Sequence, residues 1–253
     1  MRSRLSPSRR KSSTKPDFGW VARSYDELRP ADANWWEVFE LLVREGDLAG
    51  RRVLDIGCGT GRAAEALVER GSRVWGVEPE PEMAALARER VSTVKVAPAE
   101  RLPFKEGWFE RALMWLVVHL VDRPKVLAEL HRVLAPEGRL AIATFDPSYF
   151  DSFWLNELFP SLQGIDRARF PTAEELEAEL GAAGFDDVRL TRVSQEAALD
   201  RESALERIRE RFISTLDMLS EEEYEAGLAR AERELPERVE YRVEWLLAVA
   251  SRP

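Results

Sequence analysis

The stretch Arg52–Arg62, RVLDIGCGTGR, decides the fold of this chain. Its first half, Val53 to Ile56, is a short apolar run that is typical of a buried parallel strand. Glycines follow at alternate positions, where a backbone without side chains can turn tightly and let a ligand lie against it. Residues 62–70 have helical apolar spacing, and Gly71 stands where that helix would end. Strand, glycine loop and helix in this order predict the start of a βαβ nucleotide-binding unit.

The glycine loop differs from the dinucleotide-binding fingerprint G-x-G-x-x-G. Arg62 stands at the third glycine of that fingerprint, and Asp55 lies two residues before the first glycine. A carboxylate here would repel a pyrophosphate and attract an ammonium group. The pattern therefore suits S-adenosylmethionine, which carries an amino acid end and no phosphate. At these residues the chain resembles the class I S-adenosylmethionine-dependent methyltransferases, specifically the small-molecule branch typified by the ubiquinone and menaquinone methyltransferases.

Length and composition bound the class of protein. The 253 residues suffice for one domain with insertions, and 45% hydrophobic with 33% charged residues is a soluble globular balance. No apolar run approaches the roughly 20 residues of a membrane span. One cysteine and two histidines exclude a disulfide framework and argue against a Cys/His metal site. We therefore expect a cytoplasmic protein with no metal and no membrane span.

The charge is spread unevenly along the chain. The net charge is -9, yet residues 1–15 hold six basic side chains and no acid. The acidic remainder argues against nucleic acid as a partner, because phosphate contacts need a basic surface. The Ser-, Arg- and Pro-rich start lacks the apolar region of a secretory signal. It predicts a disordered basic arm over residues 1–17, followed by a methyltransferase domain over residues 18–253.

The resemblance implies a cofactor site along one edge of the sheet. Glu78 ends the predicted second strand, residues 73–78, where an acid can accept hydrogen bonds from two ribose hydroxyls. Nicotinamide enzymes share this position, so Glu78 alone does not discriminate between the two cofactors. We expect Glu78 at an open strand end outside the core. The expected cofactor contacts are Asp55, Gly57, Cys58, Gly59, Gly61, Glu78, Pro79, Met83, Ala99, Glu100 and Trp115.

Several of these residues have plainer alternatives that the sequence leaves open. Met83 fits the adenine contact of similar proteins or a place in the core. Pro98 stands where relatives carry an acid for the adenine amino group, so Glu100 would replace that acid or remain solvated. Cys58 is a small residue packed in the turn or a reactive thiol. Trp115 would stack on the cofactor or form the floor of the acceptor pocket.

Two side chains are candidate catalytic groups. Tyr25 lies in a Tyr-Asp segment, followed by Arg29-Pro30, that covers the cofactor in similar proteins. It is a wall of the active site or a packed aromatic. His119 is the only histidine near the predicted ligand edge, where it would act as a general base or as a structural residue. Methyl transfer mainly requires alignment of nucleophile, methyl carbon and sulfur, so a missing catalytic triad is compatible with catalysis.

Further matching stretches complete the predicted fold. The resemblance covers about residues 20–147 and includes APAERLPF at 97–104 and RVLAPEGRLAIATFDP at 132–147. We predict an α/β, Rossmann-like fold: a seven-stranded, mostly parallel sheet with helices on both faces and an antiparallel last strand. The sixth strand is expected over residues 185–193. Segments expected to cap the site are residues 18–48, 148–170 and 196–236.

The predicted function is methyl transfer from S-adenosylmethionine to a small-molecule acceptor by in-line displacement. The eight tryptophans, several near the predicted mouth of the site, suggest an apolar or aromatic acceptor. One alternative is a cofactor-binding protein of the same fold without catalysis. A nicotinamide-dependent oxidoreductase is a second alternative, against which Asp55 and Arg62 argue.

Overall fold

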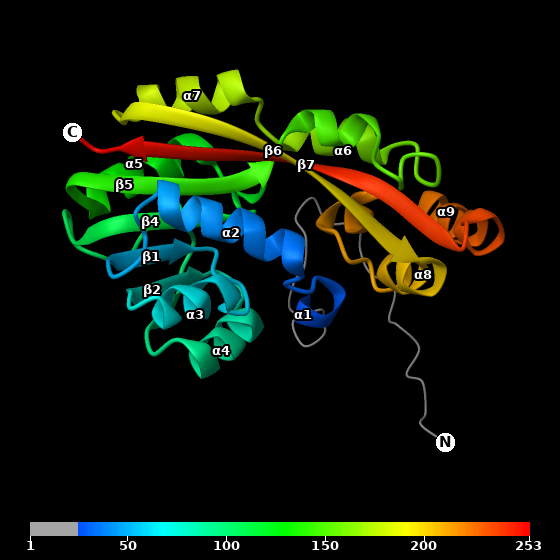
Figure 1. The fold of residues 1–253 in the computed structure, drawn as a ribbon, viewed down its shortest axis with the longest axis horizontal. Coiled ribbons are helices and arrows are strands. Elements are labelled where there is room, and N and C mark those ends of the chain that lie inside the picture. The colour runs from blue at the N-terminus through cyan, green and yellow to red at the C-terminus, as the bar shows by residue number, and fades with distance from the viewer. Residues whose placement is uncertain (1–24) are drawn as a thin grey trace.

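The computed structural model describes residues 25–253, so the arm expected over residues 1–17 lies outside the described part of the chain. Its strands are β1 (Arg52–Ile56), β2 (Arg73–Glu78), β3 (Val94–Val96), β4 (Phe109–Trp115), β5 (Leu134–Phe145), β6 (Asp186–Asp200) and β7 (Arg238–Ser251). They form one sheet in the order β3-β2-β1-β4-β5-β7-β6 (Figure 1). Strands β1 to β5 pair in parallel, and β7 is antiparallel to both neighbours. The predicted fold class is confirmed.

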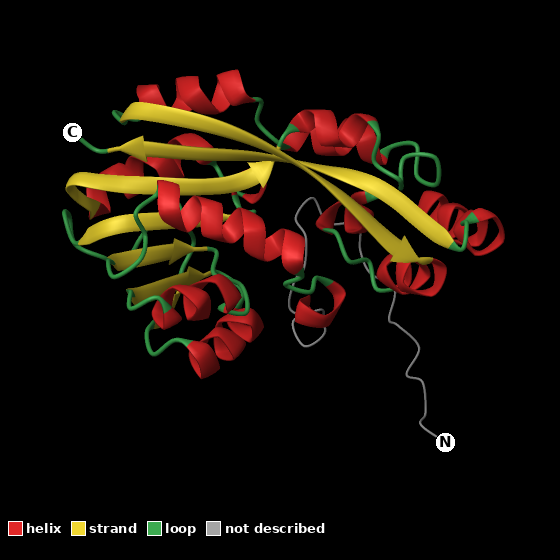
Figure 2. Cartoon of the chain, viewed as in Figure 1, coloured by secondary structure: helices red, strands yellow, loops and turns green. Residues whose placement is uncertain are grey.

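Helices flank the sheet on both faces (Figure 2). The α-helices are α1 (Tyr25–Leu28), α2 (Ala33–Glu45), α3 (Arg62–Glu69), α4 (Pro81–Arg90), α5 (Arg123–Val133), α6 (Leu162–Arg169), α7 (Ala173–Ala182), α8 (Arg201–Arg209) and α9 (Glu221–Glu234). Short 3-10 turns are η1 (Val118–Leu120), η2 (Pro147–Asp151) and η3 (Ser214–Met218). Within residues 25–253, no helix is long and apolar enough to cross a membrane.

Apolar side chains alternate between the two faces of the sheet and so form two cores. Val53 of β1 belongs to the core shared with α2, α3 and α4, whereas its neighbour Leu54 belongs to the core shared with α5 and α7. Leu247 and Leu246 of β7 divide in the same way. This alternation follows from the two-residue period of a strand covered on both faces.

Strand β6 is longer than the predicted residues 185–193. It continues to Asp200, because its antiparallel register with β7 runs without interruption from Arg189 to Asp200. The added residues 194–200 are mostly polar or small, so ladder hydrogen bonds rather than an apolar pattern keep them extended. The expected insertion over residues 196–236 therefore begins inside a strand, and its first helix starts only at Arg201.

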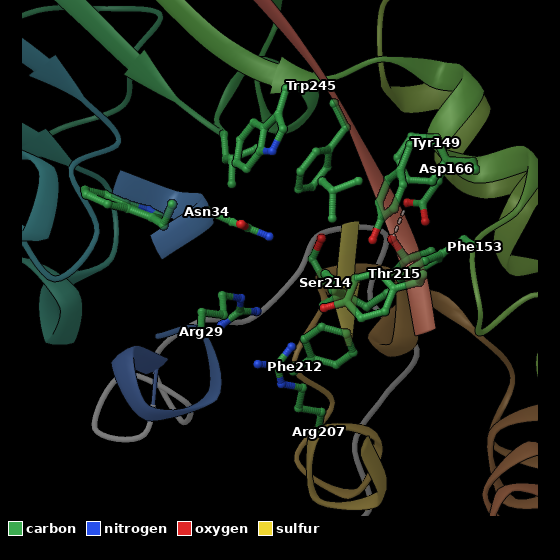
Figure 3. A pocket seen from close by; sticks show the side chains of 18 of the residues that line it. Arg29, Asn34, Tyr149, Phe153, Asp166, Arg207, Phe212, Ser214, Thr215 and Trp245 are labelled. Atoms are coloured by element: carbon green, nitrogen blue, oxygen red, sulfur yellow. Dashed lines mark hydrogen bonds between the residues drawn. The ribbon is translucent and has the colours of Figure 1, made fainter. Parts of the chain in front are cut away.

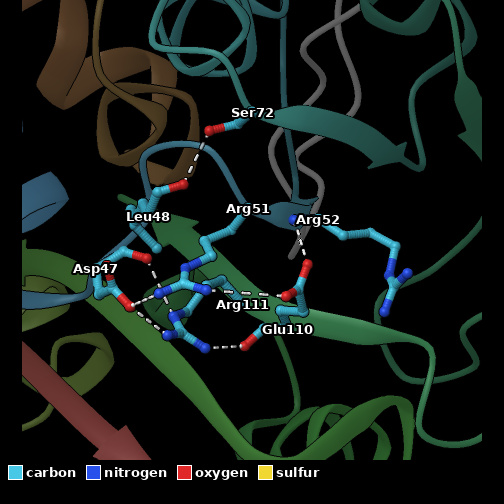
Figure 4. Close-up of polar contacts among 7 residues, drawn as sticks. All are labelled: Asp47, Leu48, Arg51, Arg52, Ser72, Glu110 and Arg111. Carbon is cyan, nitrogen blue, oxygen red and sulfur yellow. Dashed lines mark hydrogen bonds and ion pairs between the residues drawn. The ribbon is translucent and has the colours of Figure 1, made fainter.

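Polar side chains join the amino ends of β1 and β4 (Figure 4). Asp47, in the turn after α2, accepts hydrogen bonds from Arg111 and, at 2.6 Å, from Arg51. The Arg52 backbone N–H donates to the Glu110 carboxylate at 2.9 Å. This network lies at the end of the sheet opposite the carboxyl ends of the strands, where open α/β sheets bind their ligands.

Candidate active site

The glycine loop between β1 and α3 has backbone angles that favour glycine. Gly57, Gly59 and Gly61 have φ of 62°, 56° and 85°. A Cβ at Gly57 would lie 2.6 Å from a Val117 methyl carbon. A Cβ at Gly61 would lie 3.0 Å from the Ala87 Cα. At Gly59 a Cβ would meet no neighbouring atom of the structure within 4 Å, so this is where a ligand can lie against the loop.

Glu78 lies under this loop and is only 7% exposed. Its carboxylate accepts hydrogen bonds from the backbone N–H of Gly59 at 2.9 Å and of Glu80 at 3.0 Å. Burial raises the pKa of Glu78, and these two hydrogen bonds counteract it. Glu78 ends β2 as predicted, but the expectation of an open position is wrong, because the glycine loop folds back over the strand end. Each carboxylate oxygen keeps a second lone pair for a ligand hydroxyl.

Asp55 is a buried carboxyl with an unsatisfied oxygen. It is 1% exposed, and its Oδ2 has no hydrogen-bond partner. Burial, together with the nearby charge of Glu78, raises the pKa of Asp55 to about 8. An unpaired buried carboxylate is costly, and a cation beside it would stabilise the ionised form. Asp55 therefore fits an ammonium group, as the glycine-loop pattern predicts.

Cys58 is buried in the turn and is not placed to react. A Cβ at Gly76 would lie 2.7 Å from its sulfur, so the thiol fills the space against β2. Burial raises the pKa of Cys58, and the charges of Asp55 and Glu78 raise it further. The thiol is therefore protonated at neutral pH, which favours the packing role over the reactive one.

Helix α1 is joined to the glycine loop through Asp26. The Asp26 carboxylate accepts a hydrogen bond from the Thr60 hydroxyl at 2.8 Å and pairs with Arg62 at 2.9 Å and Arg90 at 2.6 Å. Arg62 also donates to the backbone carbonyl oxygens of Asp26 and Arg29. The sequence pattern used Arg62 only as a departure from the dinucleotide-binding fingerprint. It missed Asp26 because these partners lie 34 to 64 residues away, with no local pattern to link them.

Tyr25 and Met83 pack against each other beside the loop. Met83 is 2% exposed, so the structure gives it a place in the core. Tyr25 lines a cavity beyond the carboxyl ends of β4 and β5, and the Arg29 guanidinium stacks over its ring at 4.1 Å. The structure thus makes Tyr25 a wall of the cavity. An adenine contact for Met83 stays a prediction.

The remaining predicted cofactor contacts follow β2, at Pro79, and β3, at Ala99 and Glu100. Ala99 is buried, whereas Pro79 is exposed. The Glu100 carboxylate accepts a hydrogen bond from the backbone N–H of Asp122 at 3.0 Å, just before α5. Glu100 is therefore held by the protein and not only by solvent. The cofactor contacts of Ala99, Pro79 and Glu100 stay predictions.

A cavity of about 250 Å³ opens beyond the carboxyl ends of β4 and β5 (Figure 3). Its lining comes from α1 and α2, the turn after β4, the segment after β5, α6, the outer parts of β6 and β7, and the α8–η3 region. Aromatic rings from several separate elements line it: Tyr25, Trp35, Phe145, Tyr149, Phe150, Phe153, Phe170, Phe212, Tyr241 and Trp245. The cavity therefore suits a small molecule with an apolar body.

Trp115 supports this aromatic wall from behind. It is not among the cavity-lining side chains, and its ring centroid lies 5.0 Å from Trp35 and 5.6 Å from Trp245, which do line the cavity. The next residue, Leu116, faces the cavity with φ of 55°, a left-handed conformation that costs a non-glycine residue roughly 1–2 kcal/mol. A cofactor contact for Trp115 stays a prediction.

His119 faces the cavity as a neutral imidazole. Its ring stacks on Phe170 with centroids 4.1 Å apart, and its Nδ1 is buried without a hydrogen-bond partner. Burial lowers the pKa of His119 to about 3, and the charge of Arg169 contributes. A general base works best with a pKa near the operating pH, so this environment favours the structural role.

Among residues 25–253, no group of three or more His, Cys, Asp or Glu side chains could hold a metal ion.

The candidate site consists of two parts. The glycine loop, Asp55 and Glu78 form a polar cradle suited to an amino acid nucleoside, and the aromatic cavity lies next to it across α1. This is the arrangement of a protein that brings S-adenosylmethionine to a small molecule.

Comparisons with known proteins agree with that arrangement. Residues 54–142 match the family model described as "Methyltransferase domain". The chain is 30% identical to the ubiquinone/menaquinone biosynthesis C-methyltransferase of Citrifermentans bemidjiense over 68% of this chain and 87% of the relative. It therefore belongs to the class I S-adenosylmethionine-dependent methyltransferases, and S-adenosylmethionine is its cofactor.

A second relative supports this assignment, and a solved structure shares the fold. The chain is 32% identical to the demethylmenaquinone methyltransferase of Thermus thermophilus, over 66% of this chain and 90% of the relative. The solved structure of Haemonchus contortus phosphoethanolamine N-methyltransferase 2, in complex with S-adenosylhomocysteine, superposes with a TM-score of 0.59 at 20% identity. That likeness, over 93% of this chain and 57% of the other, concerns the fold alone.

Proposed function

We propose that this enzyme transfers the methyl group of S-adenosylmethionine by in-line displacement to an acceptor with an apolar or aromatic body. The observation that carries the proposal is the pairing of two features. Buried Asp55 and Glu78 flank the open face of Gly59, and an aromatic cavity lies beyond the neighbouring strand ends.

Each polar group of the loop has a proposed partner on the cofactor. Asp55, with its unsatisfied oxygen, would accept hydrogen bonds from the ammonium group. Glu78 would accept hydrogen bonds from the ribose hydroxyls while keeping its bonds to Gly59 and Glu80. The backbone of Gly59 would lie against the ligand.

The proposed methyl transfer requires little acid–base catalysis. Bound S-adenosylmethionine would supply an electrophilic methyl group on its sulfonium. The chain would hold the acceptor in line with that group, exclude water with its aromatic rings, and keep His119 neutral. Alignment of this kind can lower a barrier by roughly 7–11 kcal/mol.

We also propose that three segments cap the acceptor side of one domain, residues 18–253. Tyr25 and Trp35 come from the first segment, Tyr149 and Phe170 from the second, and Phe212 from the third, and all of them line the cavity. The single buried cysteine is consistent with a cytoplasmic enzyme. Cell fractionation with an antibody would test that location.

Calorimetry followed by a methyl-transfer assay tests the proposal. S-adenosylhomocysteine should bind the purified chain, NAD should not, and radiolabelled methyl groups should pass to one or more aromatic acceptors of a metabolite panel. Binding of NAD alone would contradict the cofactor site proposed for Asp55 and Glu78. Binding of S-adenosylhomocysteine without methylation of any member of an extensive panel would favour the non-catalytic alternative.

A further inference from the structure

Two arginines in the acceptor cavity have no acidic partner among the described residues. Arg29 follows α1 and Arg207 lies on α8, and both line the cavity. Figure 3 shows their guanidinium groups on the same side of it. No ion pair joins either arginine to an Asp or Glu within residues 25–253. Arginines on a protein with a net charge of -9 ordinarily find such partners, so their isolation here requires an explanation.

Arg29 is held in an environment that is unfavourable for a cation. Its Nη1 is buried without a hydrogen-bond partner, and its guanidinium stacks over Tyr25. Burial lowers the pKa of Arg29, and repulsion from Arg207 adds to that effect. Asp217 and Tyr25 offset it only in part. An anion placed between the guanidinium groups of Arg29 and Arg207 would accept a hydrogen bond from Arg29 Nη1 and reduce the repulsion between the two cations.

Arg207 is anchored by neutral aromatic groups. Its guanidinium lies 5.7 Å from the Phe212 ring centroid, and it is within hydrogen-bonding reach of Tyr241. These contacts orient the side chain, and no Asp or Glu within residues 25–253 forms an ion pair with it. A guanidinium fork held in this way is suited to bidentate binding of a carboxylate or phosphate.

The carboxylates that line the cavity are already engaged. Asp32 accepts a hydrogen bond from the Trp35 backbone N–H at 3.0 Å at the start of α2. Asp166 accepts the hydroxyl of Thr215 and lies 3.7 Å from Arg169. Among the described lining residues, both carboxylates thus have hydrogen-bond partners, whereas Arg29 and Arg207 form no ion pair, which favours an anionic over a cationic acceptor.

We propose that the acceptor carries a carboxylate or phosphate group, which binds between Arg29 and Arg207 while its apolar body contacts the aromatic wall. This proposal rests on the proposed function and names the class of acceptor. The backbone of Arg29 contacts Arg62 at the glycine loop, so Arg29 lies between the two halves of the site. Arg207 lies on a separate helix, so the tests concentrate on it.

The first experiment compares four probes that share one ring system and differ in charge. They are 1-naphthoate, 1-naphthyl phosphate, neutral 1-naphthamide and cationic 1-naphthylmethylamine. Binding to the full chain is followed by tryptophan fluorescence, with and without saturating S-adenosylhomocysteine. We expect at least one anion to bind about tenfold to a hundredfold more tightly than the amide, and the amine to bind no better than the amide. Comparison of the two anions decides between carboxylate and phosphate.

The second experiment assigns that preference to Arg207. Arg207→Gln should remove most of it, and Arg207→Lys should retain a part because the charge remains. Arg209→Gln is the matched control, since Arg209 lies on the same helix and pairs with Glu202 and Glu232. It should leave the preference unchanged. If Arg207→Gln does not fold, the probe series on the natural chain still tests the anion preference, and Arg207→Lys still tests whether Arg207 provides it.

Three outcomes would overturn the proposal. They are equal binding of anions and amide by the natural chain, an anion preference that survives Arg207→Gln, or a loss of S-adenosylhomocysteine affinity in that variant with probe binding unchanged. The last would assign Arg207 to the cofactor. Failure of the natural chain to bind S-adenosylhomocysteine would instead contradict the proposed function, and the probe series without cofactor would still test the anion site.

Discussion

The Glu78 carboxylate accepts a hydrogen bond from the backbone N–H of Gly59 at 2.9 Å. The residue expected to bind the ribose therefore also holds the loop against which the ligand would lie. Its two oxygens accept hydrogen bonds from Gly59 and Glu80, so the proposed ribose contact would couple cofactor binding to the stability of the loop.

Glu78→Gln should weaken both functions. Glutamine has one acceptor oxygen, so one of the two backbone N–H groups would face an amide NH2, at a cost of about 1–3 kcal/mol in unfolding free energy. S-adenosylhomocysteine affinity should fall about tenfold to a few hundredfold, since part of two charge-assisted hydrogen bonds is lost. Urea unfolding and calorimetry on the same preparation measure the two effects.

Two variants serve as controls for Glu78. Glu110→Gln weakens a similar bond, from the Arg52 backbone N–H, at the opposite end of the sheet and should leave cofactor affinity unchanged. Glu100→Gln should cost less affinity than Glu78→Gln. Unchanged affinity in Glu78→Gln would contradict the ribose contact.

Gly59→Ala should separate ligand binding from folding. An alanine at φ of 56° is strained by roughly 1–2 kcal/mol, but its Cβ would point into open space. The same Cβ would occupy the ligand position, so S-adenosylhomocysteine affinity should fall by at least about tenfold. Gly107→Ala is the matched control, because Gly107 has φ of 64° and equally open space away from the site. Equal losses of affinity in both variants would show that strain alone is responsible.

Asp55 should make the ligand-free protein less stable as the pH rises. Its pKa is raised to about 8 in the folded state, whereas an unfolded Asp ionises near pH 3.9. Between these values the folded state binds more protons, so the free energy of unfolding should fall with pH, by at most roughly 1.4 kcal/mol per unit. His119 has the opposite effect below about pH 6.5, because its pKa is lowered to about 3. Urea unfolding from pH 6.5 to 8 therefore measures the contribution of Asp55 without that of His119.

The Asp55→Asn variant provides the comparison. It should flatten the pH dependence in that interval, although Glu78, whose pKa is also raised, will leave a remainder. Saturating S-adenosylhomocysteine should flatten it in the natural chain too, because an ammonium group beside Asp55 favours the ionised form. Identical slopes for the natural chain and Asp55→Asn would contradict the buried, protonated state of Asp55.

His119 should not act as the general base. General-base catalysis typically contributes about 10² to 10⁴-fold, so His119→Asn should lower kcat by less than about tenfold and leave the shape of the pH–rate profile unchanged. In NMR titrations the His119 ring signals should remain those of a neutral imidazole from pH 8 to 5. His131→Gln removes the only other histidine signal and so assigns the resonance. A kcat loss of a hundredfold with a vanished inflection would restore the catalytic role.

The sequence by itself determined the sheet, the glycine loop and the kind of cofactor. These features depend on short-range pattern: the strand–glycine–helix run at 52–62 and the acid at Glu78, which ends the second strand. Each sets local backbone geometry through residues only a few positions apart, so each can be predicted from the local sequence.

Only the tertiary structure decided how the acceptor cavity is built. Asp26 contacts Thr60 and Arg90, which lie 34 and 64 positions away, and the cavity brings together Arg29 and Arg207 from distant parts of the chain. The length of β6 likewise depended on pairing with β7 and not on its own polar sequence. Such contacts arise when separate elements pack, because burial and charge at a site are properties of its neighbours in space.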